Sequence, residues 1–155
     1  NGEMFVPEVL MAARAMNAGM AIVKTLIADT DLPTLGTIVI GTVKGDLHDI
    51  GKNLVVMMLE SAGLKIVDLG VDAKPDDFIN AAKENNADIV AMSAMLTTTM
   101  TVMEEVINGC KDAGVDACYL VGGAPLTPVF SEKIGATYAA EASQAVETAK
   151  QMVTT

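Results

Sequence analysis

Short aliphatic segments alternate five times with amphipathic segments from residue 35 onward, and this alternation limits the possible folds more than any other feature. The predicted strands cover residues 36–43, 65–68, 88–93, 117–121 and 137–139. The predicted helices cover residues 50–62, 75–85, 99–113, 128–134 and 143–153. Strands separated by helices of this length form parallel sheets with helices on both faces. The sequence therefore predicts an α/β fold with a five-stranded, parallel, doubly wound sheet of the Rossmann or flavodoxin type.

A separate helical pattern precedes the sheet. Apolar residues recur at three- and four-residue steps over residues 3–28, which is the spacing of an amphipathic helix. The segment 29–33, with two aspartates and a proline, then breaks the pattern. We expect residues 1–30 to hold one helix of a helical domain and the start of a linker, and residues 31–155 to form the α/β domain.

Composition excludes several kinds of partner. The net charge is −10, whereas nucleic acids and anionic membranes require a basic face. The sequence has no apolar run of membrane-spanning length and no visible signal peptide. Cys110 and Cys118 lie eight residues apart, which is neither a redox nor a zinc spacing. We expect a cytoplasmic protein with reduced thiols and no nucleic-acid or membrane partner.

The only histidine stands in the segment Asp46-Leu47-His48-Asp49-Ile50-Gly51, between a predicted strand and a predicted helix. Open α/β sheets bind ligands at this edge, where the carboxyl ends of the strands lie. An imidazole there can bind a metal, and a carboxylate such as Asp46 can fix its tautomer. On residue types alone, a solvated loop histidine beside two acids is an equal alternative.

Three later loops follow strands at the same edge. They are the hydroxyl-rich segment 93–99, the segment Gly122-Gly123-Ala124-Pro125, and the segment 138–142. Each alone could be an ordinary turn, and Thr99 suits a helix N-cap. Together they place glycine, alanine and hydroxyl groups along one edge, which suits a large ligand lying between strand ends and helices.

Glycine-rich nucleotide motifs do not fit this chain. The glycines at 41, 45 and 51 have the wrong intervals for a dinucleotide fingerprint, and the segment 45–53 is one residue too long for a phosphate loop and ends in Asn. A phosphoacceptor receiver domain shares the predicted fold. It would use acids from several loops, whereas Ser93 stands at the end of the third predicted strand.

The pattern Asp46-x-His48-x-x-Gly51 resembles the DxHxxG signature of cobalamin-binding domains in the methionine-synthase class. Lys52-Asn53 follows the glycine, and the three later loops fall in the family's order and spacing. The resemblance covers residues 3–153 and is greatest for the corrinoid proteins of methylamine and methanol methyltransferase systems. It implies that residues 1–30 hold the last helix of an incomplete helical cap domain.

The resemblance implies a bound cobalamin or related corrinoid. His48 would be the lower axial ligand of cobalt, replacing the corrinoid's own base. Asp46 would accept a hydrogen bond from the other ring nitrogen, and Thr99 would be the hydroxyl partner of Asp46. One departure is Ser93-Ala94-Met95, where the family has Ser-x-Leu. The cofactor-binding residues implied are Asp46, Leu47, His48, Asp49, Ile50, Gly51, Ser93, Met95, Leu96, Thr97, Thr99, Gly122, Gly123, Ala124, Tyr138, Glu141 and Ala142.

The implied function is that of a methyl carrier. It would accept a methyl group from a substrate-specific methyltransferase and deliver it to a second methyltransferase with a thiol or folate-like acceptor, with a reductive activator as a further partner. No residue is predicted to be catalytic, and the chain is not expected to act as an enzyme alone. The alternatives are a cobalamin-binding subunit of a radical mutase, a cobalamin-sensing regulator, and a receiver-type signalling domain without corrinoid.

Overall fold

The computed structural model describes residues 8, 11–12, 14–15, 18–19 and 34–154. The chain divides into two units, residues 1–33 and 34–155, and each is treated by itself. The described residues of the first unit are helical. The rest of the helix expected over residues 3–28, and the linker at 29–33, lie outside the described residues. The assignment of residues 1–30 to a helical cap stays a prediction.

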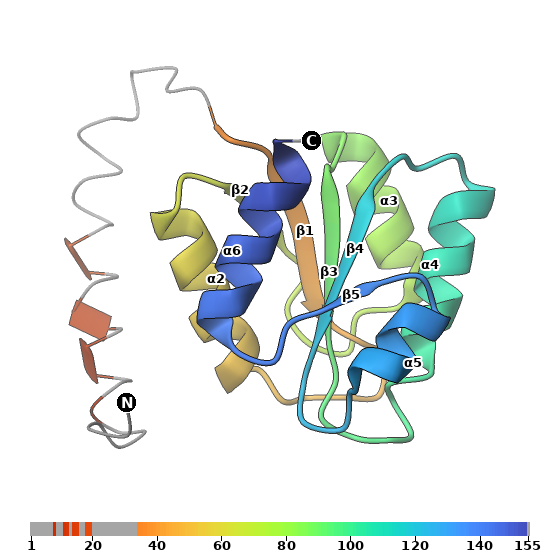
Figure 1. The fold of residues 1–155 in the computed structure, drawn as a ribbon, viewed down its shortest axis with the longest axis horizontal. Helices are drawn as coiled ribbons and strands as arrows, with labels where there is room; N and C mark the ends of the chain where they lie inside the picture. The colour runs from red at the N-terminus through yellow and green to blue at the C-terminus, as the bar shows by residue number, and fades with distance from the viewer. Residues whose placement is uncertain (1–7, 9–10, 13, 16–17, 20–33, 155) are drawn as a thin grey trace. The chain divides into compact units, whose positions relative to one another are not determined.

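The second unit is built on a five-stranded parallel sheet with the order β2-β1-β3-β4-β5 (Figure 1). The strands are β1 (Thr37–Thr42), β2 (Lys65–Asp68), β3 (Ile89–Ser93), β4 (Cys118–Gly122) and β5 (Thr137–Tyr138). Each strand lies within a residue or two of its expected bounds. The prediction of a parallel, doubly wound sheet is confirmed.

Helices cover both faces of the sheet. They are α2 (Ile50–Ser61), α3 (Pro75–Asn85), α4 (Val102–Asp112), α5 (Pro128–Lys133) and α6 (Ala142–Val153). The helices α2 and α6 pack side by side on one face, and α3 packs beside α4 on the other (Figure 1). Residues of α5 join the core of the α3–α4 face. None of the helices in the described part of the chain is long and apolar enough to cross a membrane.

Alternation along the strands supplies both cores. Ile38 and Ile40 of β1 belong to the core under α2 and α6, whereas Val39 belongs to the core under α3 and α4. Leu120 of β4 shares the first core and Val121 the second. Because successive side chains of a strand point to opposite faces, a strand buried on both sides is apolar at nearly every position.

One helix begins later than expected. Residues 99–113 were predicted to be helical, but α4 begins at Val102, after its N-cap Thr101. The Thr99 hydroxyl does not cap the helix; it donates to a carboxylate oxygen of Asp46 and to the carbonyl of Leu96. A tertiary contact therefore replaces the local cap, and it directs the β3–α4 loop toward the β1–α2 loop.

Candidate cofactor site

The β1–α2 and β3–α4 loops meet at the point where the strand order reverses. From β1 the chain crosses to β2 at one edge of the sheet, and from β3 it crosses to β4 on the other side. Asp46 joins the two loops: its Oδ2 accepts hydrogen bonds from the Met95 amide at 2.7 Å and the Thr99 hydroxyl at 2.8 Å. Ligands of open α/β sheets bind in the crevice at such a switch point.

Asp46 is a buried carboxylate with several hydrogen-bond donors. Its side chain is fully buried. Burial by itself raises the pKa of Asp46, but hydrogen bonds outweigh it: the Met95 amide, the His48 ring and amide, and the Thr99 hydroxyl hold this pKa well below its usual range. Asp46 is therefore ionised at neutral pH and acts as a hydrogen-bond acceptor.

His48 is held from one side and exposed on the other. Its Nδ1 lies 2.7 Å from Asp46 Oδ1, and its side chain is 56% exposed. Its amide also donates to Asp46 Oδ1, and its carbonyl accepts from the Thr42 hydroxyl. With an ionised acceptor at Nδ1, the proton of the neutral imidazole is held there, which leaves the lone pair on Nε2 for a metal.

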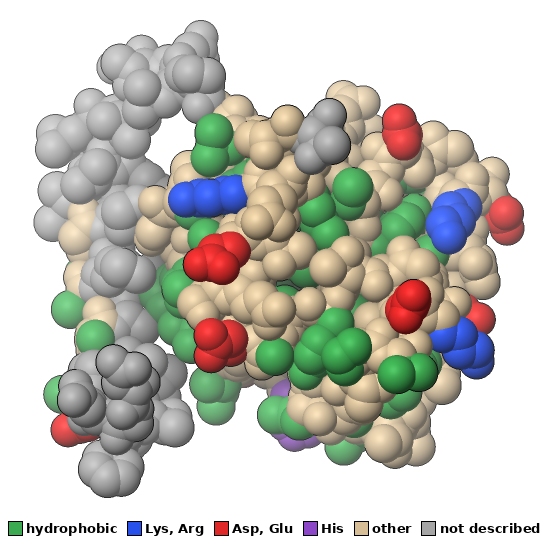
Figure 2. Space-filling model, in the orientation of Figure 1, with side chains coloured by type: hydrophobic (Ala, Val, Ile, Leu, Met, Phe, Trp, Pro, Cys, Tyr) green, Lys and Arg blue, Asp and Glu red, His purple; other side chains and the backbone are tan. Residues whose placement is uncertain are grey.

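Apolar side chains surround this histidine on the surface. Figure 2 shows the histidine in purple at the lower edge of the molecule, next to hydrophobic side chains. Leu47 and Ile50 flank it in the sequence and are 71% and 63% exposed, and Met95 and Leu96 on the facing loop are 46% and 44% exposed. Exposed apolar residues gathered around one ligand-type side chain are typical of a binding surface.

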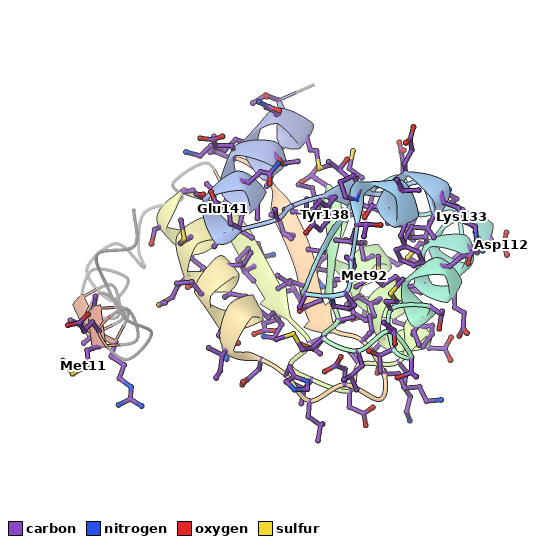
Figure 3. The ribbon with its side chains drawn as sticks, turned by 60° about the horizontal axis from the view of Figure 1, so that its bottom comes forward. Met11, Met92, Asp112, Lys133, Tyr138 and Glu141 are labelled. Atoms are coloured by element: carbon purple, nitrogen blue, oxygen red, sulfur yellow. The ribbon has the colours of Figure 1, made fainter. Side chains whose placement is uncertain are left out.

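A cavity of about 410 Å³ opens beside His48, between the sheet and the α2–α6 face. Figure 3 shows Tyr138, Glu141 at the start of α6, and Met92 toward the centre, while Asp112 and Lys133 lie at the outer side with α4 and α5. The cavity is lined by Ile40, His48, Gly51, Lys52, Leu54, Val55, Ala91, Met92, Ser93, Ala94, Met95, Leu120, Val121, Gly122, Gly123, Ala124, Tyr138, Ala139, Ala140, Glu141, Ala142 and Ala145.

Two glycines show why small residues are needed along this cavity. Gly123 has φ of +133°, and a Cβ there would collide with the Ala94 carbonyl oxygen, so only glycine lets the β3 and β4 loops approach this closely. Gly51 has nothing within 4 Å of the place a Cβ would occupy. The space beside Gly51 is therefore open to a ligand.

The structure brings most of the expected residues together. Ten of them line the cavity: His48, Gly51, Ser93, Met95, Gly122, Gly123, Ala124, Tyr138, Glu141 and Ala142. Asp46 and Thr99 lie behind His48, out of the cavity lining, and the structure shows the expected contacts of Asp46 with the ring and with the hydroxyl. The other five, Leu47, Asp49, Ile50, Leu96 and Thr97, do not line the cavity. That these residues hold a cofactor stays a prediction.

Sequence reasoning missed the inner wall of the cavity. This wall includes Ile40, Ala91 and Leu120 from the strands, and Val55 and Ala145 from the helices. A signal was available, because the segment 142–149 places alanines at 142, 145 and 149, which is the three- and four-residue spacing of one helix face. Small residues on a buried helix face leave room beside a sheet.

The single histidine also limits what kind of metal group fits. In the part of the chain that the structure describes, no three His, Cys, Asp or Glu side chains come together to hold a metal ion. His48 supplies one nitrogen donor at the mouth of a long, mostly apolar cavity. This donor set fits a metal that brings its other ligands with it in a large organic cofactor. The fold and the cavity thus define an α/β domain of the class that binds a large cofactor at the carboxyl ends of its strands.

Comparison with known proteins identifies the cofactor family. A family described as B12 binding domain matches residues 36–150, and a second one of the same description matches residues 1–24. A dimethylamine corrinoid protein of Methanosarcina acetivorans is 46% identical over 98% of this chain and 72% of its own length. The chain belongs to the B12-binding domain family, and its curated relatives are corrinoid proteins.

Solved structures agree with this assignment. The methanol:cobalamin methyltransferase complex of Methanosarcina barkeri matches with a TM-score of 0.85 at 31% identity, covering 99% of this chain and 59% of that one. The monomethylamine corrinoid protein of the same organism matches with a TM-score of 0.71 at 30% identity, covering 96% and 72%. A response-regulator receiver domain of Mycobacterium tuberculosis has a TM-score of 0.60 at only 15% identity, and that likeness concerns the fold alone.

Proposed function

We propose that this chain is a corrinoid methyl carrier that binds cobalamin, or a related corrinoid, with His48 as the lower axial ligand of cobalt. The observation that carries the proposal is the hydrogen-bonded series Thr99–Asp46–His48 at the mouth of the cavity. It leaves one imidazole nitrogen free at a surface surrounded by exposed apolar side chains. When bound, the corrinoid's cobalt supplies the methyl-transfer chemistry.

The cavity would hold the nucleotide tail of the corrinoid. A tail displaced from cobalt by His48 needs a slot between strand ends and helices, and the cavity runs from His48 past Gly51 and Gly122 to Ala145. The mouth offers polar groups such as Ser93 and Glu141, while Ile40, Ala91 and Leu120 make the inner wall apolar. This change in polarity would suit the hydroxyl groups of a sugar beside Ser93 and Glu141 and an aromatic base against the apolar wall.

Asp46 and Thr99 would set the strength of the axial ligand. The ionised carboxylate holds a proton at His48 Nδ1, which raises the basicity of Nε2. The Met95 amide and the Thr99 hydroxyl both bond to Oδ2 and fix the carboxylate in its plane. Leu47, Ile50 and Leu96 would lie against the corrin ring, which explains their exposure in the free protein.

The partners would be methyltransferases. Several curated relatives carry the names of dimethylamine corrinoid proteins, and one matching structure is a methanol:cobalamin methyltransferase complex. By analogy this chain would receive a methyl group from a substrate-specific methyltransferase and pass it to a second one with a thiol or folate-like acceptor, with a reductive activator restoring the reduced cobalt. The exposed apolar face around His48 would admit each of them in turn.

The test is to load the protein with hydroxocobalamin and record its visible and electron paramagnetic resonance spectra after reduction to cob(II)alamin. An axial imidazole nitrogen splits the cobalt(II) lines into triplets, and ¹⁵N-labelled histidine should convert these into doublets. His48→Ala should still bind cobalamin but show no splitting that responds to ¹⁵N-labelled histidine, because any triplet there comes from the corrinoid's own base. A colourless wild-type protein would overturn the proposal, as would wild-type triplets that labelling with ¹⁵N-histidine leaves unchanged.

A further inference from the structure

A buried lysine lies in the first turn of α2, four residues after His48. Lys52 is 3% exposed, and it is among the residues that line the cavity. Its position is unfavourable on two counts: a positive charge near a helix N-terminus opposes the helix dipole, and a buried ammonium loses its hydration. The first turn of α2 holds no acidic residue to offset it. A residue that violates two local rules indicates a role beyond helix formation.

The charge of Lys52 is compensated from a different strand. Its Nζ lies 2.8 Å and 2.7 Å from the two carboxylate oxygens of Asp68, the last residue of β2, and 2.8 Å from Asn53 Oδ1. Asp68 is held in turn, because its Oδ1 accepts from the Gly70 amide. All three protons of the ammonium thus have an acceptor, which fixes the first turn of α2 against the end of β2.

A series of hydrogen bonds extends from this pair to the histidine loop. The Asn53 side chain accepts from Lys52 and donates to Asp49 Oδ2 at 3.0 Å, and the Asn53 amide donates to the Asp49 carbonyl at 2.7 Å. Asp49 is the residue next to His48. The loop is therefore anchored at two ends: Asp46 is bound to the β3–α4 loop, and Asp49 is connected through Asn53 and Lys52 to β2.

We infer that Lys52 and Asp68 are a positioning pair that holds the His48 loop in the geometry needed for axial ligation. This inference rests on the proposed function. Asp46 controls the ring proton, whereas the Lys52–Asp68 pair controls where the start of α2, and with it the backbone of His48, lies. A ligating imidazole must be held within a fraction of an ångström of the position that the metal requires. Removing the groups that support a metal ligand commonly weakens metal affinity about 10- to 100-fold.

The double variant Lys52→Met/Asp68→Leu tests this without leaving a buried charge uncompensated, because both partners become apolar. Loaded with cobalamin and reduced to cobalt(II), it should bind the corrinoid but show a ratio of histidine-bound to histidine-free cobalt at least about tenfold below wild type. The readout, in protein labelled with ¹⁵N-histidine, is the fraction of the resonance signal that is split into doublets, with circular dichroism to verify folding. An unchanged fraction in the folded variant would overturn the inference.

Asp68→Asn gives a second test that keeps the shape of the side chain and removes its charge. The side chain of Asp68 is 35% exposed whereas that of Lys52 is buried, so circular dichroism must first verify that this variant folds. We expect a smaller loss of the doublet fraction than in the double variant, with Lys52→Arg retaining most of it. An undiminished doublet fraction in folded, ¹⁵N-histidine-labelled Asp68→Asn would overturn the inference.

Lys111→Met on α4 is the matched control, because Lys111 lies over the Tyr119 ring on the other face of the sheet, and it should leave the signal unchanged. If wild type binds no cobalamin, or shows no doublet with ¹⁵N-histidine, the proposed function fails. If wild type shows the doublet and the Lys52 and Asp68 variants show it equally, only the positioning role fails.

Discussion

The two faces of the sheet are built from the same strands, but one is filled and the other is left partly open. On the α3–α4 face, large side chains such as Phe78, Met103 and Ile107 are fully buried against the strands. On the α2–α6 face, alanines at 91, 139 and 145 stand where large residues could have been, and the cavity lies beside them. The cavity here arises from the small side chains that both the strands and α6 contribute.

Two glycines make the same point at the level of single residues. A Cβ on Gly41 of β1 would come within 2.9 Å of the Phe78 ring, so the room left by this glycine is occupied by an aromatic side chain. A Cβ on Gly51 of α2 would meet nothing within 4 Å. The missing side chain of Gly41 makes room for Phe78 on the α3–α4 face. The missing side chain of Gly51 leaves space open on the α2–α6 face.

Phe78→Ala should have the largest effect on stability. Phe78 is fully buried under α3, and truncation of such a residue costs about 3–5 kcal/mol because the surrounding core collapses only in part. Phe78 does not line the cavity, so the fraction of protein that still folds should bind cobalamin normally. Urea unfolding measures the loss, with Phe78→Leu as the milder control. A cost below about 1 kcal/mol would mean that the α3–α4 face is not tightly packed.

Ala145→Leu should affect binding far more than stability. Ala145 is 3% exposed and lines the inner wall of the cavity, so a leucine there would occupy the space of the ligand. We expect the dissociation constant for cobalamin to rise about 100-fold, which corresponds to about 2.7 kcal/mol. The free energy of unfolding of the free protein should change by less than about 1.5 kcal/mol.

Equilibrium titration with hydroxocobalamin, monitored by absorbance, measures the effect of Ala145→Leu. Val146→Leu, on the same helix but outside the cavity lining, is the control and should bind as wild type does. Equal affinity in the two variants would show that the cavity is not where the ligand lies.

Asp46→Asn tests the junction between the two faces, where the β1 and β3 loops meet. Because hydrogen bonds lower the pKa of Asp46 in the folded state, its ionised form stabilises the fold at every pH above the unfolded value of 3.8. This contribution is lost as the pH falls below 3.8 toward the lower folded pKa. At pH 7 the variant should be less stable by about 2 kcal/mol, since charged hydrogen bonds are lost.

Chemical unfolding at a series of pH values measures this difference between wild type and Asp46→Asn. The two proteins should converge in stability as the pH falls below about 4. A difference that stays constant from pH 7 to pH 3 would show that the ionisation of Asp46 does not matter. Thr99→Ala removes one of the donors to Asp46, so its cost should be smaller and should follow the same pH dependence.

The sequence predicted the strands, the sheet and the loop that carries His48, because alternation and a glycine-bounded helix are local signals. It also predicted which loops would meet, since the carboxyl ends of parallel strands share one edge. The start of α4 was wrong by three residues, because the Thr99 hydroxyl bonds to Asp46, which lies 53 residues away. No local pattern encodes such a partner.

The inner wall of the cavity and the Lys52–Asp68 pair were missed for a similar reason. Apolar residues at alternate strand positions indicate burial, but they do not tell whether the opposing helix fills the space. In the sequence, nothing distinguishes Lys52 from an ordinary surface lysine. The packing of α2 beside β2 brings its Nζ to 2.8 Å from Asp68 Oδ1. Both features depend on the packing of elements that are distant in sequence.

The same glycine-to-alanine change on each face should give the smallest effects and the clearest contrast. In Gly51→Ala, the free protein should gain about 0.5 kcal/mol, because alanine costs less backbone entropy in a helix and no atom stands in its way. Cobalamin should then bind several-fold more weakly, since the new methyl group lies in the cavity wall.

Gly109→Ala is the counterpart in α4, where a Cβ would come within 2.6 Å of the Ile79 side chain. Its helix propensity gain should be cancelled or reversed by this contact, and cobalamin binding should be unchanged. Thermal unfolding and cobalamin titration of the two variants, side by side, measure both quantities. If Gly109→Ala stabilised the protein as Gly51→Ala does, the α3–α4 face would have to contain free space as well. In that case side-chain size would not explain why the ligand site lies on the α2–α6 face, and its position would follow from the His48 loop alone.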